Sequence, residues 1–165
     1  MQRPEVWLRG RVADVPALLQ PVAHALLQAR EDVARALELL PPGDLWRSPG
    51  KAPPPGFHLK HLAGATDRLF AYARGEGLSD AQQRWLAAEG EATPAAVAPL
   101  EAEVDRVIEA AIAQLGDTPI EMLTTQRLIG RAKLPTTVLG CLFHGGEHAA
   151  RHAGQLLTTV QALAI

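Results

Sequence analysis

The strongest constraint on the fold is a set of long segments in which apolar residues recur every three or four positions. Such a spacing places the apolar side chains on one face of an α-helix. These segments cover about residues 15–40, 56–74, 93–115 and 135–163. Apolar alternation with a period of two, which is typical of strands, is nearly absent. The sequence therefore predicts an all-α protein.

Helix-breaking and capping residues mark the ends of the first segments. Asp14 is positioned to cap the first helix, with Pro16 in its first turn, and Gly75 is positioned to end the second. Ser79 can cap a short extra helix that reaches about Trp85. We therefore expect a short helix between the second and third long ones.

The boundaries of the last two long helices are marked by prolines. Pro94, after Thr93, is expected to open the third long helix, and Pro135 the last one. Residues 117–133 show no clear period and form the predicted loop before the last helix, in which residues 124–129 could be a short extended arm. Four long amphipathic helices each need a partner for their apolar face, and a four-helix bundle satisfies all of them.

Length and charge narrow the class of protein. With 165 residues, we expect one domain over residues 1–165, large enough to bury a core. The formal charge of −2 gives no general attraction to nucleic acid or to an anionic membrane. Residues 1–10 contain no long apolar run, and no apolar stretch is long enough to span a bilayer. We therefore expect a cytoplasmic protein without nucleic-acid or membrane partners.

Five of the six histidines lie in two short segments that are separated by most of the chain. His58 and His61 are in the second predicted helix, whereas His144, His148 and His152 follow one another at intervals of four in the last. Residues four apart lie on the same helix face, because each residue turns the helix by about 100°. Imidazole is the commonest metal ligand among side chains. The pattern therefore predicts one divalent metal ion between two helices.

The rise of the helix limits which histidines can share that ion. His144 and His152 are separated by roughly 12 Å along the axis, whereas metal–nitrogen bonds are about 2.0–2.1 Å. One adjacent pair can therefore serve, either His144 with His148 or His148 with His152. A third ligand must come from another helix, and His61 or His58 can supply it. Three protein ligands would leave an open position, as in catalytic sites.

Other residues of the chain are weaker candidates. His24 stands alone in the first helix and is interpreted as structural. Cys141, the only cysteine, lies roughly 10 Å along the axis from His148 and is not expected to bind the ion. Residues 144–148 match the H-x-x-E-H pattern of certain zinc proteases, but that class needs a carboxylate ligand further along the chain. No Asp or Glu follows His148, so we reject the protease hypothesis.

Four glycines inside the last predicted helix are a separate signal, because glycine in a helix costs roughly 0.5–1 kcal/mol relative to alanine. Gly140, Gly145, Gly146 and Gly154 indicate either close packing of another backbone or open space for a ligand. The sequence leaves both interpretations open.

Two segments together resemble a known family. Residues 56–64, GFHLKHLAG, and residues 147–155, EHAARHAGQ, are similar to the DinB-like superfamily, the DinB/YfiT group of metal-binding four-helix bundles. The resemblance implies an up-down-down-up bundle and covers nearly the whole chain. It also implies that His61, His148 and His152 bind the metal. His24, His58 and His144 have no counterpart in the family pattern, and each is a possible additional ligand.

The resemblance implies a broad range of activities. Some members of the family are similar to S-transferases that use a low-molecular-weight thiol such as bacillithiol or mycothiol. We therefore expect a divalent metal, zinc or nickel first, which deprotonates a thiol for attack on a small electrophile. Glu147 could move protons as a catalytic residue. Arg127 and Arg131 could hold an anionic thiol cofactor.

A second function class stays open. The chain could instead be a metal-binding stress-response or interaction protein without turnover, and a metal sealed by four protein ligands would favour that alternative. We also expect a homodimer. The reason is that Trp7, Trp46 and Trp85 lie outside the helix stripes, and aromatic residues are enriched at interfaces.

Overall fold

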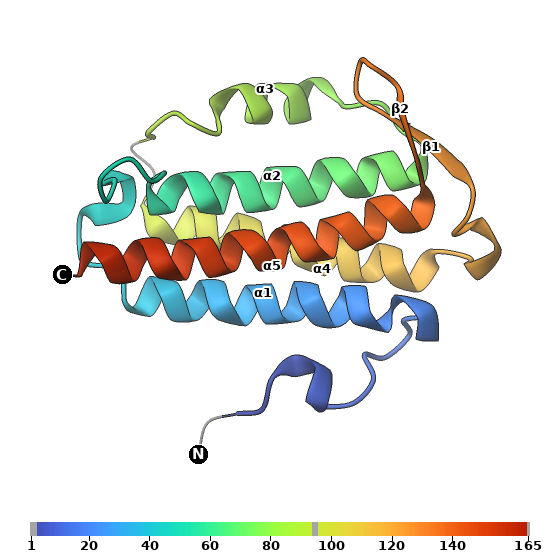
Figure 1. Ribbon diagram of the computed structural model, residues 1–165, viewed down its shortest axis with the longest axis horizontal. Coiled ribbons are helices and arrows are strands. Elements are labelled where there is room, and N and C mark those ends of the chain that lie inside the picture. Colours follow the sequence, from blue (N-terminus) through green and yellow to red (C-terminus); the bar gives the residue numbers. More distant parts are fainter. Residues whose placement is uncertain (1–2, 94–95, 165) are drawn as a thin grey trace.

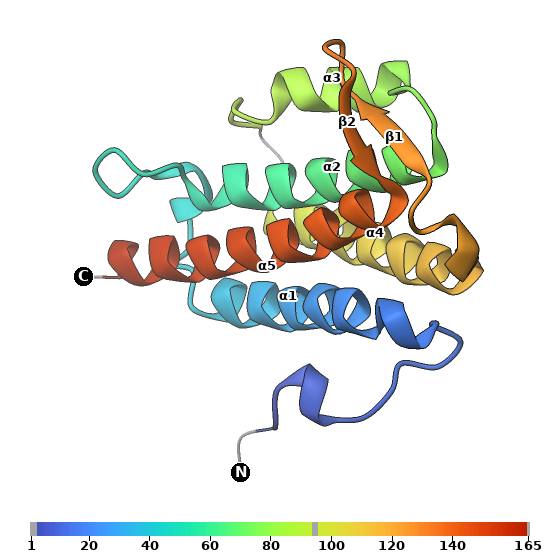
Figure 2. The same cartoon turned by 45° about the vertical axis from the view of Figure 1, so that its right-hand side comes forward.

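Four long helices lie side by side in the computed structural model, which describes residues 3–93 and 96–164 (Figure 1). A short fifth helix and a two-stranded hairpin lie against one side of them (Figure 2). The helices are α1 (Gln20–Glu38), α2 (Pro55–Arg74), α3 (Asp80–Ala88), α4 (Val97–Asp117) and α5 (Val138–Leu163), and the strands are β1 (Gln126–Ile129) and β2 (Leu134–Thr137). Short 3-10 helices cover Val6–Leu8, Ala17–Leu19, Asp44–Trp46 and Ile120–Met122.

The order and direction of the long helices confirm the predicted bundle. The chain runs along α1, returns along α2, crosses through α3 to enter α4 in the direction of α2, and comes back along α5 (Figure 1). This is the up-down-down-up arrangement. It makes α2 and α5 antiparallel neighbours, and the two histidine segments lie on these two helices.

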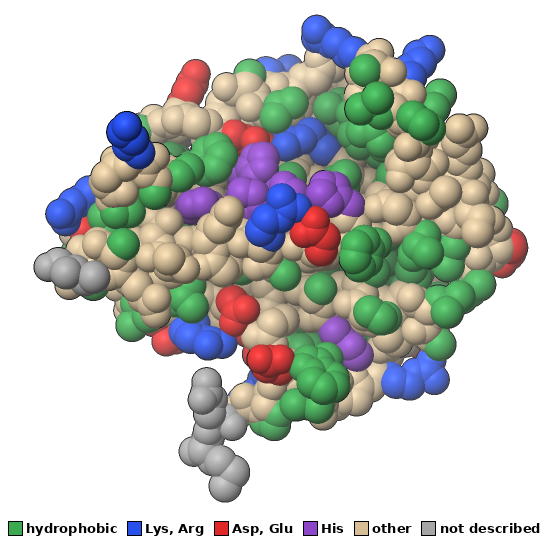
Figure 3. Space-filling model, viewed as in Figure 1, with side chains coloured by type: hydrophobic (Ala, Val, Ile, Leu, Met, Phe, Trp, Pro, Cys, Tyr) green, Lys and Arg blue, Asp and Glu red, His purple; other side chains and the backbone are tan. Residues whose placement is uncertain are grey.

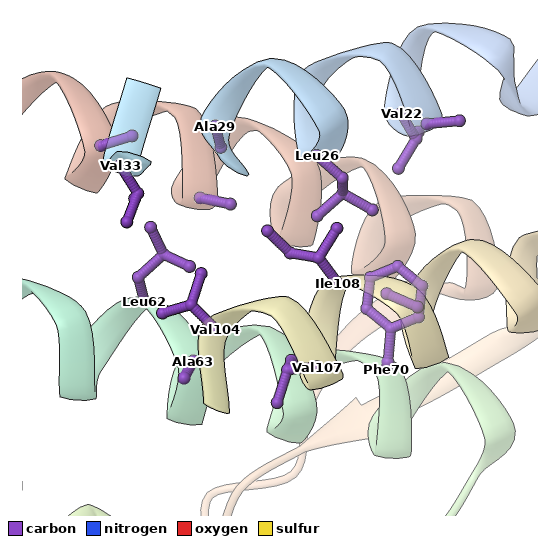
Figure 4. Packing of buried hydrophobic residues seen from close by; sticks show 14 of the residues in the cluster. Val22, Leu26, Ala29, Val33, Leu62, Ala63, Phe70, Val104, Val107 and Ile108 are labelled. Atoms are coloured by element: carbon purple, nitrogen blue, oxygen red, sulfur yellow. The ribbon is translucent and has the colours of Figure 1, made fainter. Parts of the chain in front are cut away.

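Apolar faces of all four long helices meet in one core. Leu26 of α1, Leu62 of α2 and Ile108 of α4 are at most 1% exposed and lie near its centre (Figure 4). Burying one such side chain stabilises the folded state by roughly 1.5–3 kcal/mol. The core accounts for the apolar spacing in the sequence and fixes the relative positions of α2 and α5.

The predicted start of α1 near residue 15 is wrong. Asp14 does not cap the helix, because its backbone lies in the left-handed region with φ of 59° and makes a turn. The side chain of Gln20 stabilises that turn, because it accepts a hydrogen bond from Val12 N and donates to the carbonyls of Val12 and Val15. A 3-10 turn with Pro16 at its start then leads into α1, which begins at Gln20.

The ends of α2 and α3 largely follow their local sequence. Gly75 ends α2 with φ of 83°, a conformation that glycine adopts without strain. Ser79 caps α3 in a reciprocal capping box with Gln82, and the helix extends three residues past Trp85. Pro94, which was expected to open the third long helix, lies outside the described residues, and α4 begins at Val97.

The extended arm predicted near residues 124–129 is one strand of an antiparallel hairpin. In that hairpin Gln126 pairs with Thr137 and Leu128 with Pro135. The prediction that Pro135 opens the last helix is therefore wrong. The helix begins at Val138, and Thr137 caps it by accepting a hydrogen bond from Gly140 N. Pairing with β1 competes with helix formation here, which the local sequence does not show.

Two of the three tryptophans pack against the core of the bundle. Trp46 donates a hydrogen bond to Thr93 O and Trp85 donates to Lys60 O, and both pack against the core. Trp7 is 61% exposed. The homodimer therefore stays a prediction, with Trp7 as its remaining aromatic argument. Within the described residues, the helices are all too short or too polar to cross a membrane.

Candidate metal centre

The antiparallel packing of α2 against α5 brings the two histidine segments together. One nitrogen from each of His61, His148 and His152 lies within 4.8 Å of the other two. The ring centroids of these residues are 4.5–5.0 Å apart. Histidine side chains gather as a band on one face of the molecule (Figure 3). Among the described residues, this set of three has the composition and spacing of a metal-binding group.

The spacing is close to what one ion requires. Two nitrogens bound at about 2.1 Å in a tetrahedral site are roughly 3.4 Å apart, so nitrogens that lie within 4.8 Å of one another would need to approach by at most about 1.4 Å. Side chains on two helices can make such an adjustment by small rotations about their own bonds. The three imidazoles therefore fit one divalent ion.

Burial keeps His58, His148 and His152 neutral, the form of imidazole that binds metals. Desolvation, helped by the neighbouring histidines, lowers the pKa of His148 to about 4 and that of His152 to about 3. His58 is 3% exposed, and burial lowers its pKa to about 4. At neutral pH all three rings therefore keep a free nitrogen lone pair.

His58 does not belong to the set of three histidines, but it contacts one of them, His152. Its Nδ1 lies 3.3 Å from His152 Nδ1, and its Nε2 lies 3.4 Å from Thr159 Oγ1. If His152 binds a metal through Nε2, its Nδ1 carries the proton and donates to His58. His58 then donates from Nε2 to Thr159, so this chain fixes the tautomers of both histidines.

One fully buried nitrogen of the cluster, His148 Nδ1, has no hydrogen-bond partner. His148 Nδ1 is among three buried side-chain nitrogen or oxygen atoms in the described residues that lack one. A buried polar atom without a partner is costly, and such atoms in native proteins often mark a bound water or ion. This orphaned nitrogen is a second observation that fits a metal ion at the site.

His144 and Glu147 lie at the exposed rim of the cluster. The rings of His144 and His148 are 5.3 Å apart, and His144 Nδ1 lies 3.1 Å from Glu147 Oε1. Arg151 donates to the same carboxylate at 2.5 Å and holds the pKa of Glu147 below its ordinary value.

His24 does not belong to the set of three histidines. It is on α1, where its Nε2 lies 2.9 Å from Gly10 O.

The structure does not bring the two predicted cofactor-binding arginines to the histidines. Arg127 donates to Ala73 O, and Ala73 lies twelve residues after His61, roughly 18 Å along α2. Arg131 lies in the hairpin and lines a separate pocket together with Gly75.

A pocket of about 860 Å³ opens beside the cluster between the loop before α2 and the second half of α5. His58 and His152 line it together with Pro53 and Phe57. Arg151 carries the only charged side chain among the described residues that line it. The pocket therefore offers an apolar wall, neutral imidazoles and one cation to a small molecule.

The glycines of α5 serve both purposes that the sequence left open. A side chain at Gly145 would meet the Phe70 ring at 2.8 Å, and one at Gly146 would meet Val22 at 3.2 Å, so these two allow close packing. Gly140 faces Thr136 in the same way. A side chain at Gly154 would meet no atom within 4 Å, and Gly154 lines the pocket beside the cluster.

Sequence reasoning missed two charged residues at the site. Arg151 falls inside the segment 147–155, but the helix-face argument singled out the histidines beside it. Glu89 accepts a hydrogen bond from His61 Nδ1 at 2.7 Å, although 28 residues separate the two. The pairing depends on how α3 folds back over α2, and the local sequence carries no signal for it.

The fold and the cluster together define a helical bundle with a three-histidine group that could hold a metal ion. The family model of the DinB superfamily matches residues 25–156, which is most of the chain. The chain therefore belongs to the DinB superfamily. A comparison with curated proteins found no match.

Proposed function

We propose that this protein is a metal-dependent enzyme that transfers a low-molecular-weight thiol, of the bacillithiol or mycothiol kind, to a small electrophile. The convergence of three imidazoles from α2 and α5, next to a pocket, is the observation that supports this proposal most directly. His61, His148 and His152 would hold the ion, with zinc and nickel as first candidates. When bound, such an ion would act as a Lewis acid that lowers the pKa of a thiol.

The number of protein ligands distinguishes an enzyme from a sealed metal site. Within the described residues, three histidines form the group, and His58 faces His152 without joining it. Three ligands leave room for a fourth from the substrate, as in catalytic zinc sites. This arrangement favours the enzyme over the non-catalytic stress or interaction protein.

The side chains around the pocket suggest how the reaction would proceed. The thiol sulfur would form a bond to the electrophilic carbon, while the leaving group departs with its bonding electron pair. The proton of the thiol would pass to the His144–Glu147 pair at the rim and from there to solvent. Arg151, one residue before His152, would hold an anionic group of the thiol.

The decisive experiment measures turnover with defined thiols. Metal-loaded protein should accelerate the reaction of bacillithiol or mycothiol with a panel of small electrophiles, and His61→Ala should lose both the metal and the activity. Arg151→Gln should raise KM for the thiol and leave the bound metal in place. Arg106→Gln, an equivalent change on α4 away from the pocket, is the control.

Two other outcomes would change the proposal. If Arg131→Gln, and not Arg151→Gln, raises KM for the thiol, the anionic group is held by the hairpin. If bacillithiol, mycothiol, glutathione and cysteine all react at the background rate with protein that retains its metal, the non-catalytic function becomes the better account.

A further inference from the structure

A buried ion pair between α2 and α3 extends directly to one histidine of the cluster. Glu89, which follows the last residue of α3, is 4% exposed, and its Oε2 lies 2.7 Å from His61 Nδ1. Its Oε1 accepts a hydrogen bond from Arg68 at 2.6 Å, and Arg68 is 8% exposed. Both carboxylate oxygens of Glu89 are therefore bound by side chains of α2.

The stability of the fold does not by itself account for this pair. Removing two charges from water is costly, and buried ion pairs are often no more stabilising than apolar side chains of similar size. Arg68 alone would neutralise Glu89. The second oxygen of the carboxylate instead accepts from His61, which leaves His61 Nε2 as the nitrogen free to bind a metal. This is the arrangement of a carboxylate that orients a metal-binding histidine.

The end of α3 is held on α2 by contacts on both sides of His61. Lys60 Nζ donates to the carbonyls of Ala88 and Glu91, where the helix dipole favours a cation. Trp85 Nε1 donates to Lys60 O at 2.8 Å. Gly64 makes this approach possible, because a side chain there would collide with the Trp85 ring and with Glu89.

We propose that Glu89 is a positioning residue for the metal ligand His61, and that α3 is a strap whose docking on α2 is coupled to metal binding. The proposal rests on a metal ion at the three-histidine group and not on the thiol reaction. Coupling between two binding events is reciprocal. Docked α3 therefore raises the affinity for the metal, and the bound metal holds α3 in place by the same factor.

The first test compares two variants that each weaken the contact between α2 and α3. Glu89→Gln removes the charge that orients His61 and pairs with Arg68. Gln82→Ala removes the hydrogen bonds that Gln82 makes with Asp67 and with Ser79 N, neither of which touches the cluster. The Zn²⁺ affinity is measured by competition with a chromogenic chelator. We expect Glu89→Gln to bind Zn²⁺ roughly 10–100-fold more weakly. Gln82→Ala should lose much less affinity, because it weakens the docking of α3 but leaves the contact between Glu89 and His61 in place.

Either of two results would overturn the role of Glu89. One is a Zn²⁺ affinity of Glu89→Gln that equals that of the wild type. The other is an equal loss in both variants, because it would assign the effect to α3 docking in general. Failure of the wild type to bind Zn²⁺ would overturn the proposal together with the metal centre. Normal Zn²⁺ binding without thiol turnover would count only against the proposed reaction.

A second test uses the wild-type protein and does not depend on whether a variant folds. Hydrogen exchange of backbone amides is measured with and without saturating Zn²⁺. Amides of residues 80–91 should exchange more slowly with Zn²⁺, whereas those of the hairpin, residues 126–137, should not change. Identical exchange of residues 80–91 with and without Zn²⁺, in a sample shown to bind Zn²⁺, would refute the coupling. If Glu89 had only a structural role, exchange in α3 would not depend on the metal.

Discussion

The buried histidines make the metal-free protein sensitive to acid, and His58 offers the sharpest test. Burial lowers its pKa from 6.5 to about 4. Below about pH 6.5 the unfolded chain takes up a proton at His58, whereas the folded protein does not until about pH 4. The unfolded state therefore binds more protons in this window, and the free energy of unfolding falls as the pH falls through it.

The size of the effect follows from the shift in pKa. A difference of 2.5 units between the folded and unfolded states corresponds to about 3 kcal/mol when the window is fully crossed. About 2 kcal/mol of this is lost between pH 7 and pH 5. His148 and His152 have lowered pKa values as well and contribute in the same direction. Such losses are large against a total stability of roughly 5–15 kcal/mol.

The measurement is urea unfolding at pH 7, 6 and 5 with chelator present, monitored by tryptophan fluorescence. The His58→Gln variant has no titrating group at this position, but it keeps a polar side chain of similar length that can bond to Thr159. Its free energy of unfolding should fall by about 2 kcal/mol less than that of the wild type between pH 7 and pH 5. Equal losses in both proteins would show that His58 is not held neutral by burial.

Two further predictions concern the metal and the oligomeric state. A chelator should lower the melting temperature of metal-loaded protein, because an ion bound only by the folded state stabilises it, and His148→Ala should abolish that response. An unchanged melting temperature after verified metal removal would contradict a site between α2 and α5. Light scattering at micromolar concentration should give the mass of a homodimer, and Trp7→Ser should reduce it toward the monomer if the exposed indole lies in the interface. A wild-type monomer would refute the dimer.

The features predicted correctly from the sequence share one property, which is that they repeat along a helix. Apolar residues every three or four positions gave the four long helices and their bundle. Histidines four apart gave one face of α5. Because His144 and His152 are too far apart along the axis to share one ion, the third ligand had to come from another helix. Which adjacent pair faces His61 was open from spacing alone, because the choice depends on how far α2 slides along α5. The family resemblance supplied it.

The features that the sequence did not reveal depend on contacts between distant segments. Gln20 bonds to the backbone eight residues before it and thereby delays the start of α1. Pro135 pairs with β1, and the last helix begins three residues later than expected. Glu89 reaches His61 only because α3 folds back over α2. Each is a polar or backbone contact with no period, so no pattern within a single segment predicts it.

The two structural roles of glycine in α5 lead to opposite effects of the same substitution. At Gly154 a new methyl group meets no atom within 4 Å, so Gly154→Ala should stabilise the protein by roughly 0.5–1 kcal/mol through helix propensity alone.

At Gly145 the methyl group would lie 2.8 Å from the Phe70 ring, which is 3% exposed and cannot move without disturbing the core. Overpacking of this kind costs roughly 1–3 kcal/mol, which outweighs the gain in helix propensity. Thermal unfolding of chelated protein measures both changes, with a shift of roughly 2–4 °C per kcal/mol for a chain of this size. A rise in melting temperature for Gly145→Ala would mean that α2 and α5 are not as closely packed as the contact with Phe70 requires, and the spacing of the three histidines would have to be revised with it.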